Sequence, residues 1–272
     1  MSLKHYFFLL RPINCFIAVI ATLIGYLISL GFIDFGLEIL LLMVAVFLIC
    51  GAGQAVNDYF DLEVDKRKRR KELLIEKIGA SKARTFIVIL FSAGNLLALS
   101  VSLEAFFVAV VFSLLLFFYS FKMRYFKFVG NWVIGLSAGF TYVFGATITG
   151  NYSIVFFLAI TAVFANVGRE ITKDLEDLNA DKGLKKSLPM VLGERKAGLT
   201  VLIVYLLAIF FGFYPFFTGI IPSIWFACLV FISGIVFLFS FFQIMKNEYS
   251  FSKSLSKVGM IIALIAFLVS LF

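Results

Sequence analysis

The sequence predicts an all-α polytopic membrane protein with nine transmembrane helices in one bundle. Three observations support this fold class. Hydrophobic residues make up 62% of the 272 residues, the mean hydropathy is +1.05, and apolar runs of bilayer-crossing length recur along the chain. No soluble core needs that much apolar surface, whereas a bundle of membrane helices does. We therefore expect a single transmembrane domain over residues 1–272.

Nine apolar segments account for most of the chain. Each is close to the about 20 residues with which an α-helix crosses the hydrocarbon core of a bilayer. Most of the connections are short, and short connections imply antiparallel neighbours in one bundle. The predicted spans are residues 13–32, 37–56, 85–102, 105–121, 131–149, 152–169, 198–217, 221–242 and 257–272.

Charged residues are distributed unevenly between the two ends of these spans. If the N-terminus is inside and residues at the span ends are included, all 24 Lys and Arg fall on the inner side. The outer turns carry only the acids Asp34, Glu38 and Glu104. This pattern follows the positive-inside rule and predicts an N-in, C-out topology. The net charge of +8 thus reflects topology, and we expect no nucleic-acid partner.

The three cysteines lie singly within apolar runs, as Cys15, Cys50 and Cys228. They show neither the close spacing of a zinc site nor an evident disulfide set. This placement favours their interpretation as buried packing residues.

The polar segment that follows the second span begins with regularly spaced acids. Asp58, Asp61 and Asp65 follow Gln54. At about 100° per residue, these four side chains fall within roughly 60° of one helix face. We call Gln54, Asp58, Asp61 and Asp65 the first acid motif.

A second acid motif with the same spacing follows the sixth span and consists of Glu170, Asp174, Asp177 and Asp181. The second and sixth spans are both even-numbered, so both end at the same membrane surface. An acid at the centre of a membrane helix costs about 2.5–3.5 kcal/mol on insertion and less near the interface, so acids at membrane depth usually mark function. Two matched motifs at one depth are therefore interpreted as a site rather than as solvated loop residues.

The chemistry of the two motifs points to a hard metal ion. Oxygen ligands without histidine or cysteine favour Mg²⁺ or Mn²⁺ over zinc. Mg²⁺ typically takes one or two carboxylates and completes its coordination with substrate phosphate oxygens. Two facing rows of acids therefore predict a diphosphate held between metal ions.

Basic and polar residues near the motifs fit an anionic substrate. Cations of this kind neutralise a diphosphate and the charge that develops as it departs. Anchoring of the spans at the inner surface is the alternative explanation, and it is the preferred one for the basic run 66–71. The candidate substrate-binding residues are Arg11, Asn14, Tyr119, Lys122, Arg124, Arg169 and Lys173.

The two motifs carry a resemblance to a known family. Asn57-Asp58-x-x-Asp61-x-x-x-Asp65, the second motif and the nine spans resemble the UbiA superfamily of intramembrane prenyltransferases over essentially the whole chain. The sequence REITKDLEDLNADKG, followed by Leu188-Pro189 and Gly193, is most similar to the archaeal branch. That branch includes enzymes that make the second ether bond of archaeal lipids.

The resemblance implies a fold, a reaction and a location. The implied fold is a nine-helix bundle in the cell membrane around a lipid-accessible cavity. Two cytoplasmic loops would cap this cavity. The implied reaction is Mg²⁺-dependent transfer of a geranylgeranyl group from geranylgeranyl diphosphate to the free hydroxyl of geranylgeranylglyceryl phosphate. The expected partners are thus a prenyl diphosphate donor, a lipid-like acceptor that bears a phosphate, and membrane lipids.

Family roles carried onto matching positions give the candidate site residues. Asp58, Asp61, Asp174, Asp177 and Asp181 would form the metal and diphosphate group, assisted by Asn57 and by Asp65 as a further metal ligand. Of these, Asp58, Asp61, Asp174 and Asp177 are the candidate catalytic acids, and Lys173 is the candidate catalytic cation. The sequence departs from the family where Tyr119 is followed by Lys122 and Arg124 at an unusual step, so the cation that takes this role stays open.

Two alternatives remain at this point. Within the same enzyme class, the acceptor would be an aromatic compound such as a quinone or haem precursor. In a different class, the acids would serve an ion transporter, although transporters usually place their site near the midplane on broken helices. The acceptor requirement of the purified protein separates these readings.

Overall fold

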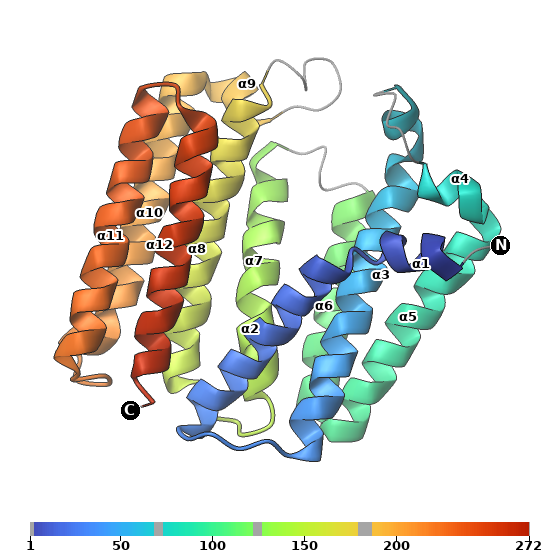
Figure 1. Ribbon diagram of the computed structural model, residues 1–272, viewed down its shortest axis with the longest axis horizontal. Coiled ribbons are helices and arrows are strands. Elements are labelled where there is room, and N and C mark those ends of the chain that lie inside the picture. Colours follow the sequence, from blue (N-terminus) through green and yellow to red (C-terminus); the bar gives the residue numbers. More distant parts are fainter. Residues whose placement is uncertain (1–2, 68–72, 122–126, 179–186, 272) are drawn as a thin grey trace. The chain divides into compact units, whose positions relative to one another are not determined.

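The computed structural model describes residues 3–67, 73–121, 127–178 and 187–271 (Figure 1). These residues form α-helices joined by turns and contain no β-strand, as predicted. Nine of the helices are long and apolar enough to cross a membrane, which confirms the nine predicted spans in the described part of the chain. They are α2 (Pro12–Leu30), α3 (Leu37–Arg67), α5 (Ala80–Val101), α6 (Leu103–Phe121), α7 (Lys127–Ala146), α8 (Ser153–Glu176), α10 (Glu194–Phe217), α11 (Ile224–Met245) and α12 (Tyr249–Val269). Three short helices accompany them, α1 (Leu3–Leu9), α4 (Leu74–Ile78) and α9 (Leu188–Leu192).

The helices form two compact units. Unit 1 contains α1, most of α2, α3 to α6 and the end of α7, whereas unit 2 contains the start of α7 and α8 to α12. The first acid motif therefore belongs to unit 1 and the second to unit 2. That the chain is one domain, and that both motifs meet in one lipid-accessible cavity, stay predictions.

Unit 1 is built around α3, which packs against α5 and α6. The approach to α5 is close at Gly94, where an added Cβ would lie 2.6 Å from Cγ1 of Ile49 and 3.0 Å from the carbonyl oxygen of Ala45. Such contacts matter because lipid tails are as apolar as the side chains, so membrane helices associate through van der Waals packing of small residues. The first acid motif thus continues from a firmly packed helix.

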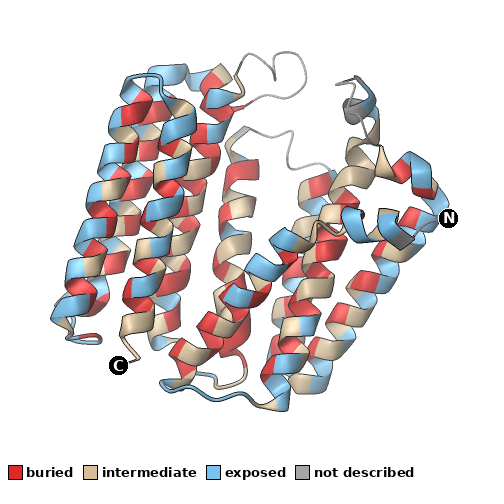
Figure 2. Ribbon diagram, viewed as in Figure 1, coloured by how far each residue is buried: buried red, intermediate tan, exposed pale blue. Residues whose placement is uncertain are grey.

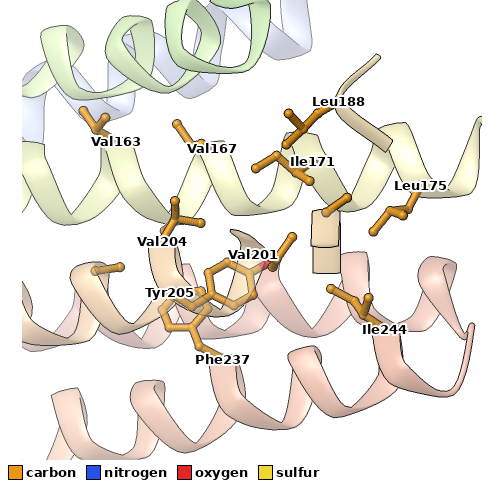
Figure 3. Packing of buried hydrophobic residues seen from close by; sticks show 13 residues of the cluster. Val163, Val167, Ile171, Leu175, Leu188, Val201, Val204, Tyr205, Phe237 and Ile244 are labelled. Atoms are coloured by element: carbon orange, nitrogen blue, oxygen red, sulfur yellow. The ribbon is translucent and has the colours of Figure 1, made fainter. Parts of the chain in front are cut away.

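Unit 2 is built around α8, which packs against α10 and α12, while α11 packs against α10 and α12. Its buried core contains Val167 and Ile171 of α8, Val201 and Tyr205 of α10, and Phe237 of α11 (Figure 3). The Tyr205 ring lies directly on Gly168, where an added Cβ would be 2.3 Å from Cε1 of the ring. The segment that carries the second acid motif is therefore fixed by a dense apolar core immediately before the motif begins.

Exposed residues occur along many helices (Figure 2), and many of them are large apolar residues. Phe217 is 77% exposed and Trp225 is 71% exposed. A soluble protein rarely leaves so many apolar side chains in water, whereas a bilayer solvates them. Together with the nine apolar helices, this surface makes the chain a multi-pass membrane protein.

The two acid motifs differ in backbone structure. As predicted, the first motif lies on a helix, because α3 continues beyond the expected end of the span to Arg67. The expectation of a helical face for the whole second motif is wrong, because α8 ends at Glu176 and Asp177 already lies in a turn. Aspartate side chains compete with the helical hydrogen-bond pattern and favour helix ends. Asp181 lies outside the described residues.

Candidate functional site

The first acid motif presents its described side chains half-buried along α3. Gln54, Asn57, Asp58 and Asp61 are all intermediate in exposure. The backbone at Asp65 is helical, and its side chain lies outside the described part of the structure. The motif follows directly on the buried residues Ala55 and Val56, so its carboxylates begin where the apolar core ends.

Arg11 joins the first acid motif from the corner between α1 and α2. Its Nη2 donates to Oδ1 of Asp58 at 2.5 Å, and its Nη1 donates to Oε1 of Gln54 at 3.2 Å. The backbone at Arg11 has φ of 48°, a left-handed conformation that is uncommon for residues other than glycine. Pro12 then begins α2, where its fixed φ suits the first helical position. The turn thus directs the guanidinium at the motif, and the role of Arg11 in substrate binding stays a prediction.

Two cysteines that are far apart in sequence meet beside this corner. The thiols of Cys15 on α2 and Cys50 on α3 lie within hydrogen-bond distance, and Cys50 also contacts Gln54. The Cys15 thiol donates to the carbonyl oxygen of Leu10 at 3.1 Å. The cysteines are free thiols, of which Cys15 is buried, Cys50 is half-buried and Cys228 is exposed, so the expectation of buried packing residues is correct for Cys15 alone.

The end of α3 is tied to α4. Lys66 lies 2.9 Å from Oε1 of Glu76 and 3.0 Å from Oε1 of Glu63. The Glu76 and Glu63 carboxylates raise the pKa of Lys66 above its ordinary value, so this lysine stays charged across the neutral pH range. Residues 68–71 of the basic run lie outside the described residues.

Two further candidate residues lie in the described part of unit 1. Asn14 is exposed in the first turn of α2, and Tyr119 is half-buried near the end of α6. Lys122 and Arg124 lie outside the described residues. Their predicted roles therefore stay predictions.

The second acid motif gathers two of the predicted cations around Glu170. Nη1 of Arg169 donates to Oε1 of Glu170 at 3.3 Å, and Nζ of Lys173 lies 3.5 Å from Oε2 of the same carboxylate. Glu170 is only 8% exposed. Nε of Arg169 is buried and has no hydrogen-bond partner among the described residues. A buried guanidinium nitrogen without a partner is a donor suited to an anionic group.

Asn131 on α7 is a residue of this site that the sequence interpretation missed. Its Nδ2 donates to Oδ2 of Asp174 at 3.1 Å, and both side chains are buried. The available signal was a lone asparagine in the first turn of the fifth apolar span. That end of the span is predicted to lie at the same membrane surface as the second motif. The partner of this asparagine on the next helix is not visible in a single sequence.

The end of α8 is further held by α12. Lys253 of α12 pairs with Glu176, which lies between Asp174 and Asp177 in the sequence. This ion pair is partly exposed, so it fixes the end of the helix more than it adds stability.

The two motifs share one arrangement. In each, the residue four positions before the first aspartate, Gln54 or Glu170, accepts a hydrogen bond from an arginine. The donor set is oxygen only, which fits Mg²⁺. In the described part of the chain no three His, Cys, Asp or Glu side chains converge, and a Mg²⁺ site needs only one or two carboxylates because phosphate oxygens and water complete it.

Comparison with known proteins decides the family. Residues 18–269 match the UbiA prenyltransferase family. The chain belongs to this family. The resemblance predicted from the two motifs is thereby confirmed, and with it membership in a family of prenyltransferases.

This member of the UbiA family resembles known relatives in both sequence and structure. It is 32% identical to the digeranylgeranylglyceryl phosphate synthase of Thermococcus gammatolerans, over 99% of each chain. A solved structure described as giving insight into digeranylgeranylglyceryl phosphate synthase in membranes matches with a TM-score of 0.89 and 33% identity, covering 99% of this chain and 98% of that one. A UbiA homologue from Archaeoglobus fulgidus, bound to DMAPP and Mg²⁺, shares the fold with a TM-score of 0.74 at 15% identity, covering 97% of this chain and 99% of that one.

Proposed function

We propose that this UbiA family member transfers a geranylgeranyl group from geranylgeranyl diphosphate to the free hydroxyl of geranylgeranylglyceryl phosphate. The product carries the second ether bond of an archaeal membrane lipid. The observation that carries this proposal is the 32% identity to a synthase of that name over 99% of both chains. A similarity of this length includes both acid motifs, both following loops and all nine spans.

The residues fit Mg²⁺ as the metal that holds the donor diphosphate. Asp58, Asp61 and Asp65 would hold it in the first motif, and Asp174, Asp177 and Asp181 in the second. When bound, the metal would supply Lewis-acid stabilisation of the charge that collects on the diphosphate. Support comes from the oxygen-only donor set and from the A. fulgidus homologue described with Mg²⁺ and DMAPP.

The basic residues of the chain would also stabilise the negative charge of the diphosphate. Arg11 beside Asp58, and Arg169 and Lys173 beside Glu170, would bind the diphosphate oxygens and Asn57 would assist. As the allylic C–O bond breaks, its electron pair moves to the diphosphate, and these cations favour that charge. The acceptor hydroxyl oxygen then attacks the cation-like carbon to form the ether bond, and its proton passes to the departing diphosphate. Asn14, Tyr119, Lys122 and Arg124 are proposed as further substrate-binding residues.

The apolar helices would provide the prenyl chain with a dry environment. Water that reached the allylic cation would hydrolyse it, so exclusion of water protects the reaction. We place the active site at the cytoplasmic face of the cell membrane because the Lys and Arg residues follow the positive-inside pattern. The phosphate on the acceptor agrees with the excess of cations at that face.

The proposal is tested by turnover of the purified protein with geranylgeranyl diphosphate and Mg²⁺. Geranylgeranylglyceryl phosphate and 4-hydroxybenzoate are offered separately, and diphosphate release is measured with and without EDTA. We expect metal-dependent release only with the glyceryl phosphate acceptor.

The other outcomes are equally informative. Product with 4-hydroxybenzoate alone would keep the family chemistry and replace the acceptor by an aromatic one. If no diphosphate is released with either acceptor and the protein carries metal ions into vesicles, the proposal is overturned in favour of transport. Asp58→Asn and Asp174→Asn serve as inactive controls, and retained turnover in both would remove the acid motifs from the mechanism.

A further inference from the structure

We propose that Asn131 is a positioning residue that holds the Asp174 carboxylate in the orientation needed for metal binding. This inference rests on the proposed function, because it concerns the metal site of the second acid motif. Asn131 is 6% exposed and Asp174 is 7% exposed. The hydrogen bond from Nδ2 to Oδ2 measures 3.1 Å and links α7 to α8.

The packing of α7 on α8 explains why the amide reaches the carboxylate. An added Cβ at Gly139 would lie 2.6 Å from Cγ2 of Val163, and one at Gly135 would lie 2.6 Å from Cγ2 of Val167. Moving four residues back along α7 therefore moves four residues forward along α8, as expected for antiparallel helices in close contact. One more step of four reaches Asn131 on α7 and the first turn of the second acid motif on α8. The two glycines thus set both the distance and the register of the hydrogen bond.

A neutral amide is well suited to this task. It donates one hydrogen bond and orients the carboxylate without cancelling its negative charge. Asp58 of the first motif differs, because its partner is the cationic Arg11. Hydrogen-bond partners of metal-binding carboxylates typically change metal affinity by about 10–100-fold when they are removed. An apolar residue at position 131 would remove this hydrogen bond from the buried carboxylate.

The test measures metal binding directly, without substrate. Mn²⁺ is titrated into the purified protein and followed by electron paramagnetic resonance. Asn131→Ala removes the amide and leaves space, Asn131→Leu fills the space, and Asn131→Ser retains a hydroxyl donor. We expect Mn²⁺ binding to weaken about 10–100-fold in the first two variants and by less in the serine variant. Activity should follow, with a higher Mg²⁺ concentration at half-maximal turnover and nearly unchanged turnover at saturating Mg²⁺.

Asn95 on α5 offers a matched control. Its Nδ2 makes part-buried hydrogen bonds, at 2.8 Å to the carbonyl oxygen of Phe91 and 3.0 Å to Oγ of Ser113, and neither partner belongs to an acid motif. Asn95→Ala and Asn95→Leu should therefore bind Mn²⁺ like the wild type. Asp174→Asn is the reference for a lost ligand.

The outcomes separate this inference from the proposed function. Wild-type Mn²⁺ affinity in Asn131→Ala, with loss in Asp174→Asn, would overturn the role of Asn131 and leave the function standing. Wild-type affinity in Asp174→Asn would overturn the metal site itself. If Asn131→Leu does not fold, Asn131→Ala decides, because alanine is readily accommodated where membrane helices approach closely.

Discussion

Arg11 combines a left-handed backbone conformation with direct contacts to Asp58 and Gln54 of the first acid motif. A non-glycine residue in the left-handed region costs on the order of 1–3 kcal/mol and persists where the surrounding contacts over-determine it. Here those contacts are the hydrogen bonds to Asp58 and Gln54. Such a cost is explained if the guanidinium is needed at the motif.

We expect Arg11→Ala to lose about 10–100-fold in kcat/KM for the prenyl diphosphate. The reason is that a hydrogen bond to a charged group contributes about 1.5–3 kcal/mol. Arg11→Lys should recover only part of this loss, since lysine retains the charge but not the paired geometry. Initial rates of diphosphate release against donor concentration measure both effects.

Arg84 in the first turns of α5 is the matched control. Arg84→Ala removes an equal charge from the same unit and should leave kcat/KM within about twofold, as expected for a surface substitution away from the site. Equal losses in both variants would mean that general membrane anchoring, and not contact with the motif, explains Arg11.

At this scale the sequence predicted the acids better than their partners. The shared helix face of Asp58 and Asp61 follows from their spacing alone, whereas Arg11 was a substrate-binding candidate for which membrane anchoring was an open alternative. Asn131 and the meeting of Cys15 with Cys50 depend on helix register across the bundle. A single sequence does not encode that register in any local pattern.

The helices show where backbone contact, rather than hydrophobicity, determines the packing. In unit 1, α2 and α7 meet at Gly25 and Gly145. An added Cβ at Gly145 would lie 1.9 Å from the carbonyl oxygen of Thr22, and one at Gly25 would lie 2.0 Å from that of Tyr142. The two helices can approach this closely only because both positions are glycine.

Gly145→Ala should therefore destabilise the protein. Overpacking at a tight contact costs about 1–3 kcal/mol or more, and we expect the melting temperature in detergent to fall by about 5 °C or more. Gly36→Ala is the control, since an added Cβ there meets nothing within 4 Å. A melting temperature for Gly145→Ala equal to that of Gly36→Ala would contradict the close approach of α2 and α7.

The ends of the helices were harder to predict than their existence. Apolar runs near 20 residues identify the spans, because a bilayer imposes that length. The continuation of α3 to Arg67 and the end of α8 at Glu176 depend on polar residues beyond the membrane. There the bilayer no longer constrains the chain, and local hydrogen bonding of aspartate decides where the helix stops.

For the molecule as a whole, the charge pattern predicts an orientation that can be measured. A variant without the three native cysteines carries either Asp34→Cys, between α2 and α3, or Lys82→Cys, at the start of α5. In intact cells, a membrane-impermeant maleimide should label the first and not the second, because the positive-inside rule puts lysine-rich ends in the cytoplasm. Both should be labelled after permeabilisation. The reverse pattern in intact cells would invert the topology.

The division of the acid motifs between two units makes a kinetic prediction about the whole chain. If both motifs serve one reaction, Asp58→Asn and Asp174→Asn each remove a function that the other motif cannot supply. Residues that act as a unit in catalysis show strongly non-additive losses. The double variant should therefore be no slower than the slower single variant, as judged by diphosphate release over long incubations. Losses that multiply would instead mean that each motif contributes independently, for example by binding donor and acceptor phosphates separately, and would assign the two units different substrates.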